Sequence, residues 1–571
     1  MIELNPDGQF GSPWKALQRN AGLFENIAEF QADTFMTYAR FEAGATVRLG
    51  DYPYKVAESS ATDHHLENAA DPPMKLYAQP INGSYFMPVQ FGAPLNGVDD
   101  DGDAIAACIA YAQTNGFSVN LGSGEYRIEA RTTPLLDFER TTLDGGSNRF
   151  SLIGEHPSVT RFDVVGDCTD FLFKVSGNTT GYSSENPRAS WFKFASFSIN
   201  GNGNYFDIFN FICADRCNIQ DFSAFDFRGH AVKGEQWWDS ECDARFVRGG
   251  DSPRLVYVTG AQAFSKGQTV TGTTSGATAW IVDVTSTRLD LTEISGTFLA
   301  NEAITGATNG AATVAAADFL EGSEKAVIEF THVFPERIFD SACNNIIFPA
   351  TAQIEGYRWR ALNWDQATRQ NKFHGKIHWF IDRAYYGPAV YLNGGTSNDF
   401  NGAGTTHNSE LGSVILVNGS ASYISTGNKF TDCRIDGSIE FTGDNRYNVV
   451  SGNIFNNGAD PCVILGGGKD NMIRDNMPRG SGQELLNTAT DRDYALLDRI
   501  INERVNIGRD TPPGGWGPER LSVYDHTQDL LVRVASGDAL ASIQIADSNT
   551  TDDLRISAQG NLIVASTLAN E

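Results

Sequence analysis

A short unit recurs along the middle of the chain, and it constrains the fold more than any other sequence feature. A typical copy has Asn or Asp, an apolar residue, a polar pair and a second apolar residue before a turn. Examples are 217–222, 345–348, 371–377, 428–435, 448–455 and 471–476. Several copies lie 20 to 26 residues apart, the length of one solenoid coil. One coil cannot bury its inner face alone, so stacked coils are expected to create the core.

Length and composition agree with an elongated, strand-rich chain. The 571 residues exceed the size at which one compact core keeps growing. Gly is abundant with 57 residues, Phe is frequent with 36, and Met is scarce with 6. This balance suits strands and turns better than packed helices. We therefore expect an all-β fold.

The stretch around residue 100 predicts a helical cap on the first coil. Phe91-Gly92-Ala93 and the acidic run 96–103 precede a predicted helix at 104–115, and a strand follows within 116–128. The apolar face of this helix contains Ile105, Cys108, Ile109 and Ala112. Acidic side chains ahead of a helix satisfy free amide groups of its first turn and complement its dipole. The helix can then cover an open sheet end, whose backbone groups would otherwise be unpaired.

This order of motifs resembles the N-terminal cap and first coil of pectate-lyase-like β-helices, a pattern very common in bacteriophage tailspikes. Gly102 replaces the threonine that usually follows the aspartate pair. The resemblance covers about forty residues and implies a right-handed parallel β-helix over roughly residues 86–490. It does not imply one chemistry, because this fold hosts lyases, hydrolases, epimerases and pure binding proteins.

Three further segments flank or interrupt the predicted β-helix. Residues 1–85 form a head region, in which 41–56 predict two short strands joined by a turn. Residues 255–318 hold two copies of one unit at an offset of 34 residues, which predicts a small inserted β-module. It resembles Thr-Gly-Ala-rich modules of phage tail proteins that are suspected of glycan binding, and an exposed spacer explains it equally well. Residues 491–571 begin with a linker and resemble the C-terminal β-domain that joins tailspike chains into trimers.

Charge and hydropathy exclude several partners. The formal net charge is −27, from 43 Lys and Arg against 70 Asp and Glu, which would repel nucleic acids and anionic membranes. No apolar run reaches the ~18 residues that span a bilayer, and the N-terminus lacks a basic-then-apolar secretion signal. We therefore expect no nucleic-acid partner and no membrane insertion. If the protein works outside a cell, we expect it to leave by a route other than secretion, and the release of assembled virions by lysis is one such route.

The eight cysteines are scattered, and only Cys213 and Cys217 are close in sequence. No His follows them at the spacing of zinc ligands. We expect buried free thiols that act as small apolar side chains. The sequence predicts no metal site and no cofactor.

Residues 237–246 supply the first candidate site. If Trp238, Ser240, Cys242, Ala244 and Phe246 point inward, one outer row is formed by Trp237, Asp239, Glu241, Asp243 and Arg245. Alternate residues of a strand lie about 6.5–7 Å apart on one face. Glycoside hydrolysis uses two carboxyl groups about 5–9.5 Å apart. The predicted catalytic carboxylates are therefore in this row, with Trp237 and Arg245 binding substrate, and a row of solvated acids is the alternative.

A second row has the same alternation with cationic side chains. Lys372, His374, Lys376 and His378 face outward if Phe373, Gly375, Ile377 and Trp379 face inward. Such a strip suits the binding of acidic sugars or the base of a lyase, and an ordinary solvated face is the alternative. Further candidates are the acids Glu355 and Asp382, with Tyr357 as a binding residue.

The phrase 228–234 weakly resembles the Gly-His-Gly signature of polygalacturonases. It lacks the second Gly and an upstream Asp-Asp motif, so a structural turn is the favoured interpretation.

The resemblance implies a function as well as a fold. It implies a trimeric phage tailspike in the virion tail, attached through its N-terminal region, that binds a bacterial surface polysaccharide. The carboxylate row favours depolymerisation by glycosidic bond hydrolysis. A polysaccharide lyase that acts by β-elimination and a non-catalytic receptor-binding protein remain alternatives.

Overall fold

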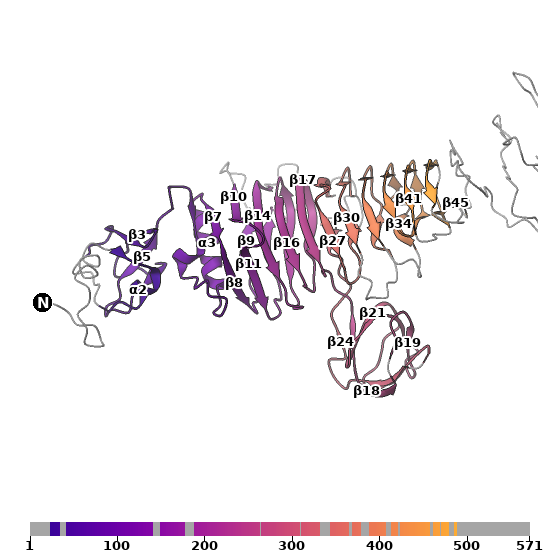
Figure 1. The fold of residues 1–571 in the computed structure, drawn as a ribbon, viewed down its shortest axis with the longest axis horizontal. Coiled ribbons are helices and arrows are strands. Elements are labelled where there is room, and N and C mark those ends of the chain that lie inside the picture. The colour runs from indigo at the N-terminus through magenta and orange to yellow at the C-terminus, as the bar shows by residue number, and fades with distance from the viewer. Residues whose placement is uncertain are drawn as a thin grey trace, which may run out of the picture.

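The computed structural model confirms the parallel β-helix (Figure 1). It describes residues 23–34, 41–140, 149–177, 188–262, 264–308, 310–331, 343–364, 368–378, 388–406, 413–420, 423–456, 461–468, 470–478 and 485–487. A small sheet lies at the N-terminal end of the β-helix, and a barrel projects from its side. The expected C-terminal β-domain at 491–571 lies outside the described residues.

Each coil contributes strands to three walls, in which neighbouring coils pair in parallel. Wall A contains β9 (Leu136–Glu139), β12 (Phe171–Ser176), β13 (Ala189–Ser190), β15 (Asp207–Asp215), the start of β17 (Val232–Val247), β25 (Ile328–Thr331), β28 (Leu362–Trp364), β31 (Val390–Asn393), β34 (Ser413–Gly419), β38 (Ser438–Gly443), β42 (Val463–Leu465) and β45 (Leu485–Asn487).

The second wall, wall B, follows wall A along each coil. It contains β6 (Tyr85–Phe86), β7 (Ser118–Gly122), β10 (Phe150–Gly154), the first halves of β14 (Phe192–Asn200) and β16 (Asn218–Phe225), the middle of β17, β26 (Asn344–Phe348), β29 (Lys372–Phe373), β32 (Asp399–Asn401), β36 (Lys429–Thr431), β40 (Val449–Ser451) and β43 (Met472–Arg474). The short strands β35 (Ser425–Thr426) and β39 (Asn445–Arg446) pair at the corner between walls A and B.

Wall C closes each coil. It contains β8 (Gly124–Glu129), β11 (Thr160–Val165), the second halves of β14 and β16, the end of β17, β27 (Gln353–Glu355), β30 (Lys376–His378), β33 (Gly404–Thr406), β37 (Arg434–Ile435), β41 (Ile454–Phe455) and β44 (Met477–Pro478).

Aromatic side chains stack through the core from coil to coil. Trp237 lies 4.7 Å from Phe211 and 6.0 Å from Phe330 between ring centroids. Trp364 continues the column at 5.2 Å from Phe330 and 5.3 Å from Phe400. These rings are fully or almost fully buried, so the frequent Phe of the sequence fills the interior of the stacked coils.

An asparagine ladder explains the repeated Asn of the sequence. The side-chain oxygen of Asn398 accepts bonds from the backbone N–H and the Nδ2 of Asn371, at 3.1 and 3.2 Å. Asn398 donates in the same way to Asn428, at 3.1 and 3.0 Å, and Asn448 and Asn471 extend the series. All of these side chains are buried. Each coil therefore satisfies the polar groups of the next turn inside the fold.

The predicted cap helix is confirmed as α3 (Gly102–Thr114), which follows the 3-10 helix η1 (Pro88–Phe91). Its buried face contains Ile105, Cys108, Ile109 and Ala112, as expected. The acidic run acts in part as predicted, because Asp100 Oδ1 accepts from the amide of Gly102, the first residue of the helix, at 3.1 Å. Asp101 makes no side-chain bond to the helix. Its carboxylate accepts bonds from the amides of Leu95 at 3.0 Å and Arg127 at 2.9 Å, and it therefore ties the helix start to β8.

The head contains a five-stranded sheet that shares one apolar core with the β-helix. Its elements are β1 (Leu23–Phe24), α2 (Ile27–Gln31), β2 (Thr46–Leu49), β3 (Tyr52–Val56), β4 (Leu66–Glu67) and β5 (Lys75–Ala78). The two strands expected within 41–56 are β2 and β3. The ring of His65 joins head to cap, with its centroid 4.3 Å from Phe91 and 4.2 Å from Tyr111.

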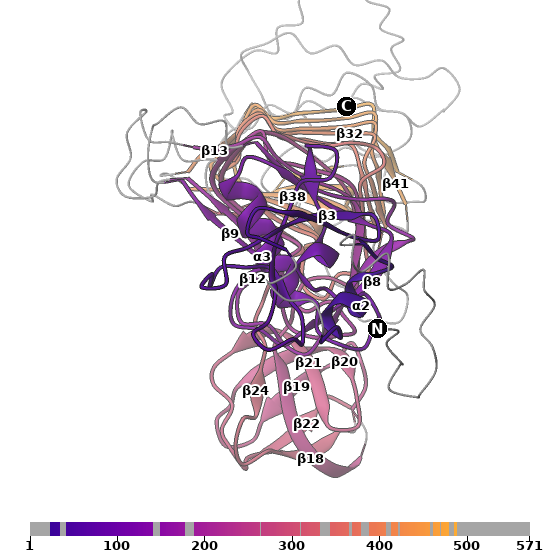
Figure 2. The ribbon, with the colours of Figure 1, turned by 90° about the vertical axis from the view of Figure 1, so that its left-hand side faces the viewer.

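The inserted segment forms an antiparallel barrel with its own apolar core, which projects from the β-helix (Figure 2). Its strands are β18 (Arg254–Gln262), β19 (Thr269–Gly272), β20 (Thr278–Val284), β21 (Arg288–Ser295), β22 (Ala303–Gly306), β23 (Ala311–Val314) and β24 (Leu320–Glu321). β18 pairs with both β21 and β23, which closes the ring of strands.

The duplication seen in the sequence is a structural duplication. Phe264 and Phe298 are equivalent and both buried, as are Val270 and Ile304. β19 and β22, one from each copy, pair with each other. The barrel therefore arises from two similar halves that complete one core.

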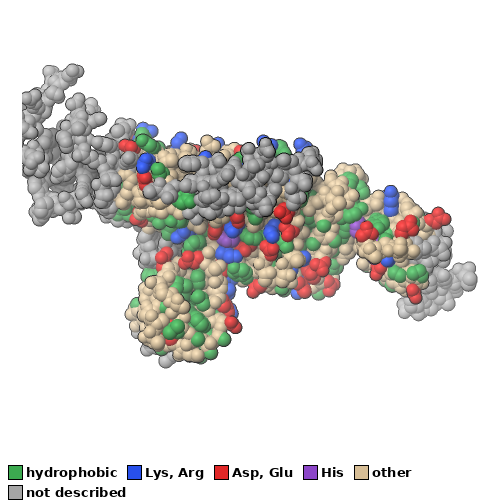
Figure 3. All heavy atoms as spheres, turned by 180° about the vertical axis from the view of Figure 1, so that it is seen from behind, with side chains coloured by type: hydrophobic (Ala, Val, Ile, Leu, Met, Phe, Trp, Pro, Cys, Tyr) green, Lys and Arg blue, Asp and Glu red, His purple; other side chains and the backbone are tan. Residues whose placement is uncertain are grey.

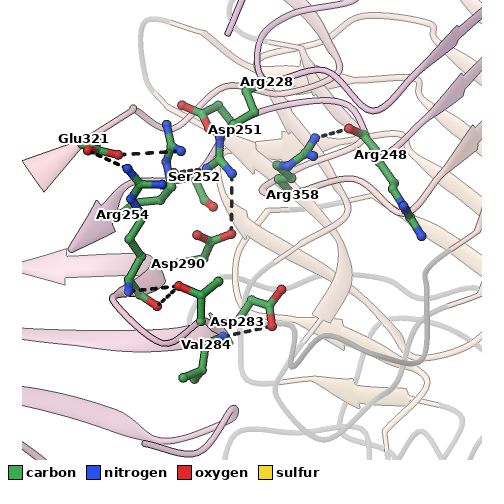
Figure 4. A network of polar contacts seen from close by, with 12 residues as sticks. Arg228, Arg248, Asp251, Ser252, Arg254, Asp283, Val284, Asp290, Glu321 and Arg358 are labelled. Atoms are coloured by element: carbon green, nitrogen blue, oxygen red, sulfur yellow. Dashed lines mark hydrogen bonds and ion pairs between the residues drawn. The ribbon is translucent and has the colours of Figure 1, made fainter. Parts of the chain in front are cut away.

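Buried ion pairs hold the barrel against the β-helix (Figure 4). Asp251 is fully buried and accepts a bond from Arg228 Nε at 2.7 Å. The other nitrogens of Arg228 reach Ser252 O at 3.1 Å and Asp290 at 3.8 Å. On the face shown in Figure 3, charged side chains gather on the β-helix beside the barrel. The phrase 228–234 thus has the structural role that was favoured for it.

All eight cysteines are buried and free, as expected. None of the helices in the described part of the chain has the length and apolar character needed to cross a membrane.

Candidate functional site

Most side chains of the predicted row on β17 lie on the outer face of the β-helix, and the position predicted for one of them, Trp237, is wrong. Asp239 and Arg245 are exposed, and Glu241 and Asp243 are half-buried. Trp237 was predicted on this row and is instead fully buried. Its indole N–H donates to Cys217 O at 3.0 Å inside the core, so it cannot bind a substrate.

The backbone at Asp239 explains the error. Asp239 has a φ of 45°, which places two successive residues, Trp238 and Asp239, on the outside. Burial alternates strictly from Val232 to Gln236 and again from Ser240 onward, and the alternation is interrupted between these two stretches. A corner of the coil therefore shifts the phase of the pattern by one residue.

The carboxylates of the row bond to side chains of neighbouring coils. Asp239 accepts from Asn345 Nδ2 at 2.9 Å, and Asp243 accepts from Thr351 Oγ1 at 2.7 Å. Glu241 accepts from Gln220 Nε2 at 3.2 Å. Such bonds stabilise carboxylates in a structural role as well as in a catalytic one.

Glu355 lies on β27 in wall C, next to the end of β17, and Tyr357 follows two residues later. Arg245 binds Glu355 through two nitrogens at 3.2 and 3.0 Å, so this candidate acid is held in an ion pair. Tyr357 was predicted to bind substrate, yet only 1% of it is exposed. Gly356, with a φ of 62°, turns the chain inward at the corner after β27. Asp382 lies outside the described residues.

The cationic row alternates as predicted but bends around a corner. Lys372 and Lys376 are exposed, and His374 and His378 are half-buried, while Phe373, Gly375 and Ile377 are buried. Trp379, which was predicted to face inward, lies outside the described residues. Lys372 belongs to β29 in wall B, whereas Lys376 and His378 belong to β30 in wall C. The four side chains therefore occupy two walls and form no single straight strip.

A different cluster lies at the corner between walls A and B, where each coil turns two residues outward. We call it the corner array, and its members are Ser190, Trp191, Asp215, Arg216, Trp238, Asp239, Asn344 and Asn345. Ser190 pairs with Asp215, Asp215 with Trp238, and Trp238 with Asn344. Paired strands lie about 4.8 Å apart, so four successive coils present one continuous polar and aromatic patch.

Guanidinium groups cover the aromatic faces of the corner array. The Arg188 guanidinium carbon lies 3.4 Å from the ring centroid of Trp238. Arg216 and Arg149 lie over Trp191 at 4.8 and 5.4 Å. Trp191 is 46% exposed, so this stack borders solvent. Cation–π contacts of this kind orient both partners.

Asp215 has the most unusual environment in the array. Its Oδ1 is buried and has no hydrogen-bond partner among the described residues, and the same is true of Asn344 Oδ1, two coils on. The other oxygen of Asp215 lies 3.9 Å from Arg216, beyond hydrogen-bond distance. Buried unpaired polar atoms are rare in native proteins, and a binding or catalytic role is one reason for them.

Burial raises the pKa of the Asp215 carboxyl above its ordinary value. The negative charge of Asp239 raises this pKa further, while the charges of Arg216 and Arg188 lower it in part. The geometry thus combines a carboxyl group whose pKa is raised with a second carboxyl group, Asp239, on the next coil. Two carboxyl groups in different environments are the arrangement that acid–base catalysis on glycosides uses.

Sequence reasoning found Asp239 and missed the rest of this array. The dipeptides Ser190-Trp191, Asp215-Arg216 and Trp238-Asp239 start 25 and 23 residues apart, which is one coil each. Aligning the coils by this spacing would have placed the three dipeptides on one corner. A search along single strands could not find it. Among the described residues, no group of three or more side chains has the make-up of a metal site.

Stacked parallel coils wound into three walls around an aromatic core define this chain as a parallel β-helix protein. Solved structures that it resembles are phage tailspikes and polysaccharide-modifying enzymes of the parallel β-helix type. The ORF18 protein of Geobacillus virus E2 has 14% identity over 84% of this chain and 74% of its own, with a TM-score of 0.43.

Two further solved structures share the fold. The tailspike protein of Acinetobacter baumannii phage AM24 has 10% identity, covers 85% of this chain and 68% of its own, and has a TM-score of 0.37. WceF of Pantoea stewartii, described as a glycan biofilm modifying enzyme with a tailspike-like fold, has 12% identity, covers 76% and 48%, and has a TM-score of 0.29. No protein-family model and no curated protein matches the sequence.

Proposed function

We propose that this chain is a bacteriophage tailspike that binds a bacterial surface polysaccharide and hydrolyses its glycosidic bonds at the corner array. The observation that carries the proposal is the Asp215 carboxyl, with its buried unpaired oxygen and raised pKa beside Asp239. Trp191, which is 46% exposed, supplies aromatic surface next to it, which suits sugar rings. The resemblance of residues 91–128 to tailspike caps supports the tailspike assignment.

The two carboxyl groups have different roles in this reaction. Asp215, whose pKa burial raises, gives its proton to the glycosidic oxygen as the bond to the anomeric carbon breaks. Asp239, whose charge is stabilised by the amide of Asn345 at 2.9 Å, acts as a carboxylate on the anomeric side. It either activates the attacking water or attacks the anomeric carbon itself, and water then completes the hydrolysis.

The long outer surface suits a polymer better than a small sugar. The corner array repeats over four coils, and each coil adds about 4.8 Å along the helix axis. A chain of sugars can therefore contact several coils at once. We further propose that the N-terminal region attaches the protein to the phage tail, that three chains assemble, and that the protein acts outside the host cell from the virion tail.

The test uses purified capsules and O-antigens from candidate hosts. Hydrolysis releases new reducing ends without absorbance near 235 nm, whereas β-elimination also creates an unsaturated sugar that absorbs there. Binding without either signal identifies a non-catalytic receptor-binding protein.

Variants locate the site within the same assay. We expect D215N and D239N to lower kcat by at least about a hundredfold, the usual order for the loss of an acid or base. E241Q and D243N serve as matched controls on the same strand and should retain cleavage. If E241Q or D243N loses cleavage while D215N keeps full activity, the active site lies at the row on β17 and not at the corner array.

A further inference from the structure

We infer that the polysaccharide is acidic and that Arg216 binds a carboxylate of a sugar next to the scissile bond. This inference rests on the proposed function of the corner array. Three arginines, Arg149, Arg188 and Arg216, surround two tryptophans in a chain of net charge −27. Such a local excess of positive charge favours an anionic ligand.

The stacking geometry prepares the guanidinium group of Arg216 for this role. An arginine that lies over an indole uses its flat face, so the N–H donors around its edge stay available. The guanidinium carbon of Arg216 lies 4.8 Å from the centroid of the Trp191 ring. Two parallel edge donors match the two oxygens of a carboxylate, which Lys cannot do. The side chain of Arg216 is 47% exposed, so a ligand can reach it.

The charge of Arg216 is not neutralised within the array when Asp215 is protonated. Among the described residues, the acid recorded beside Arg216 is Asp215, at 3.9 Å. At 3.9 Å the two groups make no hydrogen bond, so the N–H donors of Arg216 remain available to a substrate anion. Sugar carboxylates include uronic acids and pyruvate ketals, and both present the same bidentate group.

The experiment compares one cleaved polysaccharide with its chemically altered forms. Carbodiimide and borohydride reduction converts all carboxyl groups to neutral alcohols while the glycosidic linkages remain. Mild acid removes pyruvate ketals alone and thus separates the two sources of the carboxylate. Binding is measured with D215N, which leaves the polymer intact, and cleavage is measured with the wild-type chain.

We expect reduction of the polymer to raise KM and to weaken binding by about tenfold to a hundredfold, the range for a lost charge-assisted bond. R216Q should bind the native polymer as weakly as the wild type binds the reduced one, and R216K should fall between them. R161Q is the matched control, because Arg161 is 46% exposed and pairs with Glu125 on wall C. It should behave as wild type.

The outcomes separate this inference from the proposed function. If native and reduced polymer are cleaved equally, or if the cleaved polymer has no carboxyl groups, the inference of an acidic substrate is wrong. The proposed hydrolase activity is not affected by that result. Full cleavage by D215N overturns the active site regardless of the substrate charge. If no polymer is cleaved, equal binding of native and reduced polymers by the wild type overturns the inference on binding alone.

Discussion

Gln268 and Glu302, which are 34 residues apart, hold equivalent places in the two halves of the inserted barrel, and each binds the loop of the other half. Gln268 Oε1 accepts from Thr308 Oγ1 at 2.7 Å. Glu302 accepts from the Ser275 hydroxyl at 2.9 Å and the Ser275 amide at 3.0 Å. The exchange fastens each half to the other.

Removal of Glu302 should therefore loosen the whole barrel. Glu302→Ala leaves the amides of Leu299 and Ser275 without their acceptor, and we expect a local loss of about 2–4 kcal/mol. Hydrogen exchange of β19–β23 peptides in the full chain measures it. Arg288→Ala, at a 45% exposed side chain, is the control and should cost less than about 1 kcal/mol. Unchanged exchange in Glu302→Ala would contradict the reciprocal arrangement.

The orientation of the barrel should depend on Asp251. Asp251→Ala leaves the buried Arg228 with its bond to Ser252 O at 3.1 Å and with the distant carboxylate of Asp290 at 3.8 Å, and we expect a loss of about 3–5 kcal/mol for a broken buried pair. Limited proteolysis should then cut near 250–253 or 322–326, while the barrel and the β-helix stay intact. Glu321→Gln, which affects a more exposed ion pair, should leave the digestion pattern unchanged. If Asp251→Ala resists proteolysis as well as the wild type does, backbone pairing alone is enough to fix the barrel to the β-helix.

The asparagine ladder should contribute strongly to stability. Asn398→Ala removes the acceptor of the Asn371 amide in a fully buried site, and we expect a loss of about 2–4 kcal/mol in urea unfolding. Asn398→Asp should cost more, because it buries a charge next to the Asn428 oxygen. Asn401→Ala, on an exposed position, should stay within about 0.5 kcal/mol. Equal stability of the Asn398 and Asn401 variants would refute the role of the ladder.

Acid should weaken the attachment of the head through His65. Burial lowers the pKa of His65 from 6.5 to about 4, and its Nδ1 accepts the Ala78 amide at 2.8 Å. The unfolded chain binds this proton below about pH 6.5 and the folded chain only near pH 4, so stability falls between these values. The loss is on the order of 2–3 kcal/mol.

The measurement for His65 compares urea unfolding at several pH values. His65→Asn keeps an acceptor but does not titrate, and it should lose less stability than wild type as pH falls. His156→Asn replaces an exposed histidine and should follow the wild type. A parallel decline in wild type and His65→Asn would rule out His65 as the titrating group.

The pH dependence of cleavage should report the Asp215 proton. Its raised pKa keeps the acid protonated above the ordinary range of Asp, and kcat/KM should fall on the alkaline side as it ionises. Arg216 lowers this pKa, so R216Q should move the alkaline limb to higher pH. If the alkaline side of the kcat/KM pH profile does not shift in R216Q, another group supplies the proton.

Sequence reasoning predicted the fold where the signals are regular. The spacing of Asn371, Asn428, Asn448 and Asn471 indicated coils because each turn needs the same buried amide. The apolar face of α3 followed from the helical period. The bonds of Asp101 to Leu95 and Arg127 could not be predicted, since they depend on where β8 lies against the helix.

The candidate site was harder to predict because it lies at a corner. The alternation rule placed Asp239 and Arg245 correctly and failed at Trp237, where residues with positive φ interrupt the strand. Asp215 showed no local signal at all. Its environment is created by Trp238, which pairs with it from the next coil and therefore lies one full coil away in the sequence.

The two ends of the inserted barrel meet at one point of the β-helix. Asp251 and Lys325 bond to each other through their backbone groups at 2.9 and 3.0 Å. A coil that lacked the barrel could close there with a tight turn, and the strands on either side would keep their register. Recombination at this point can thus add, delete or replace the barrel as one unit, so that related proteins can vary the barrel while they inherit the same β-helix.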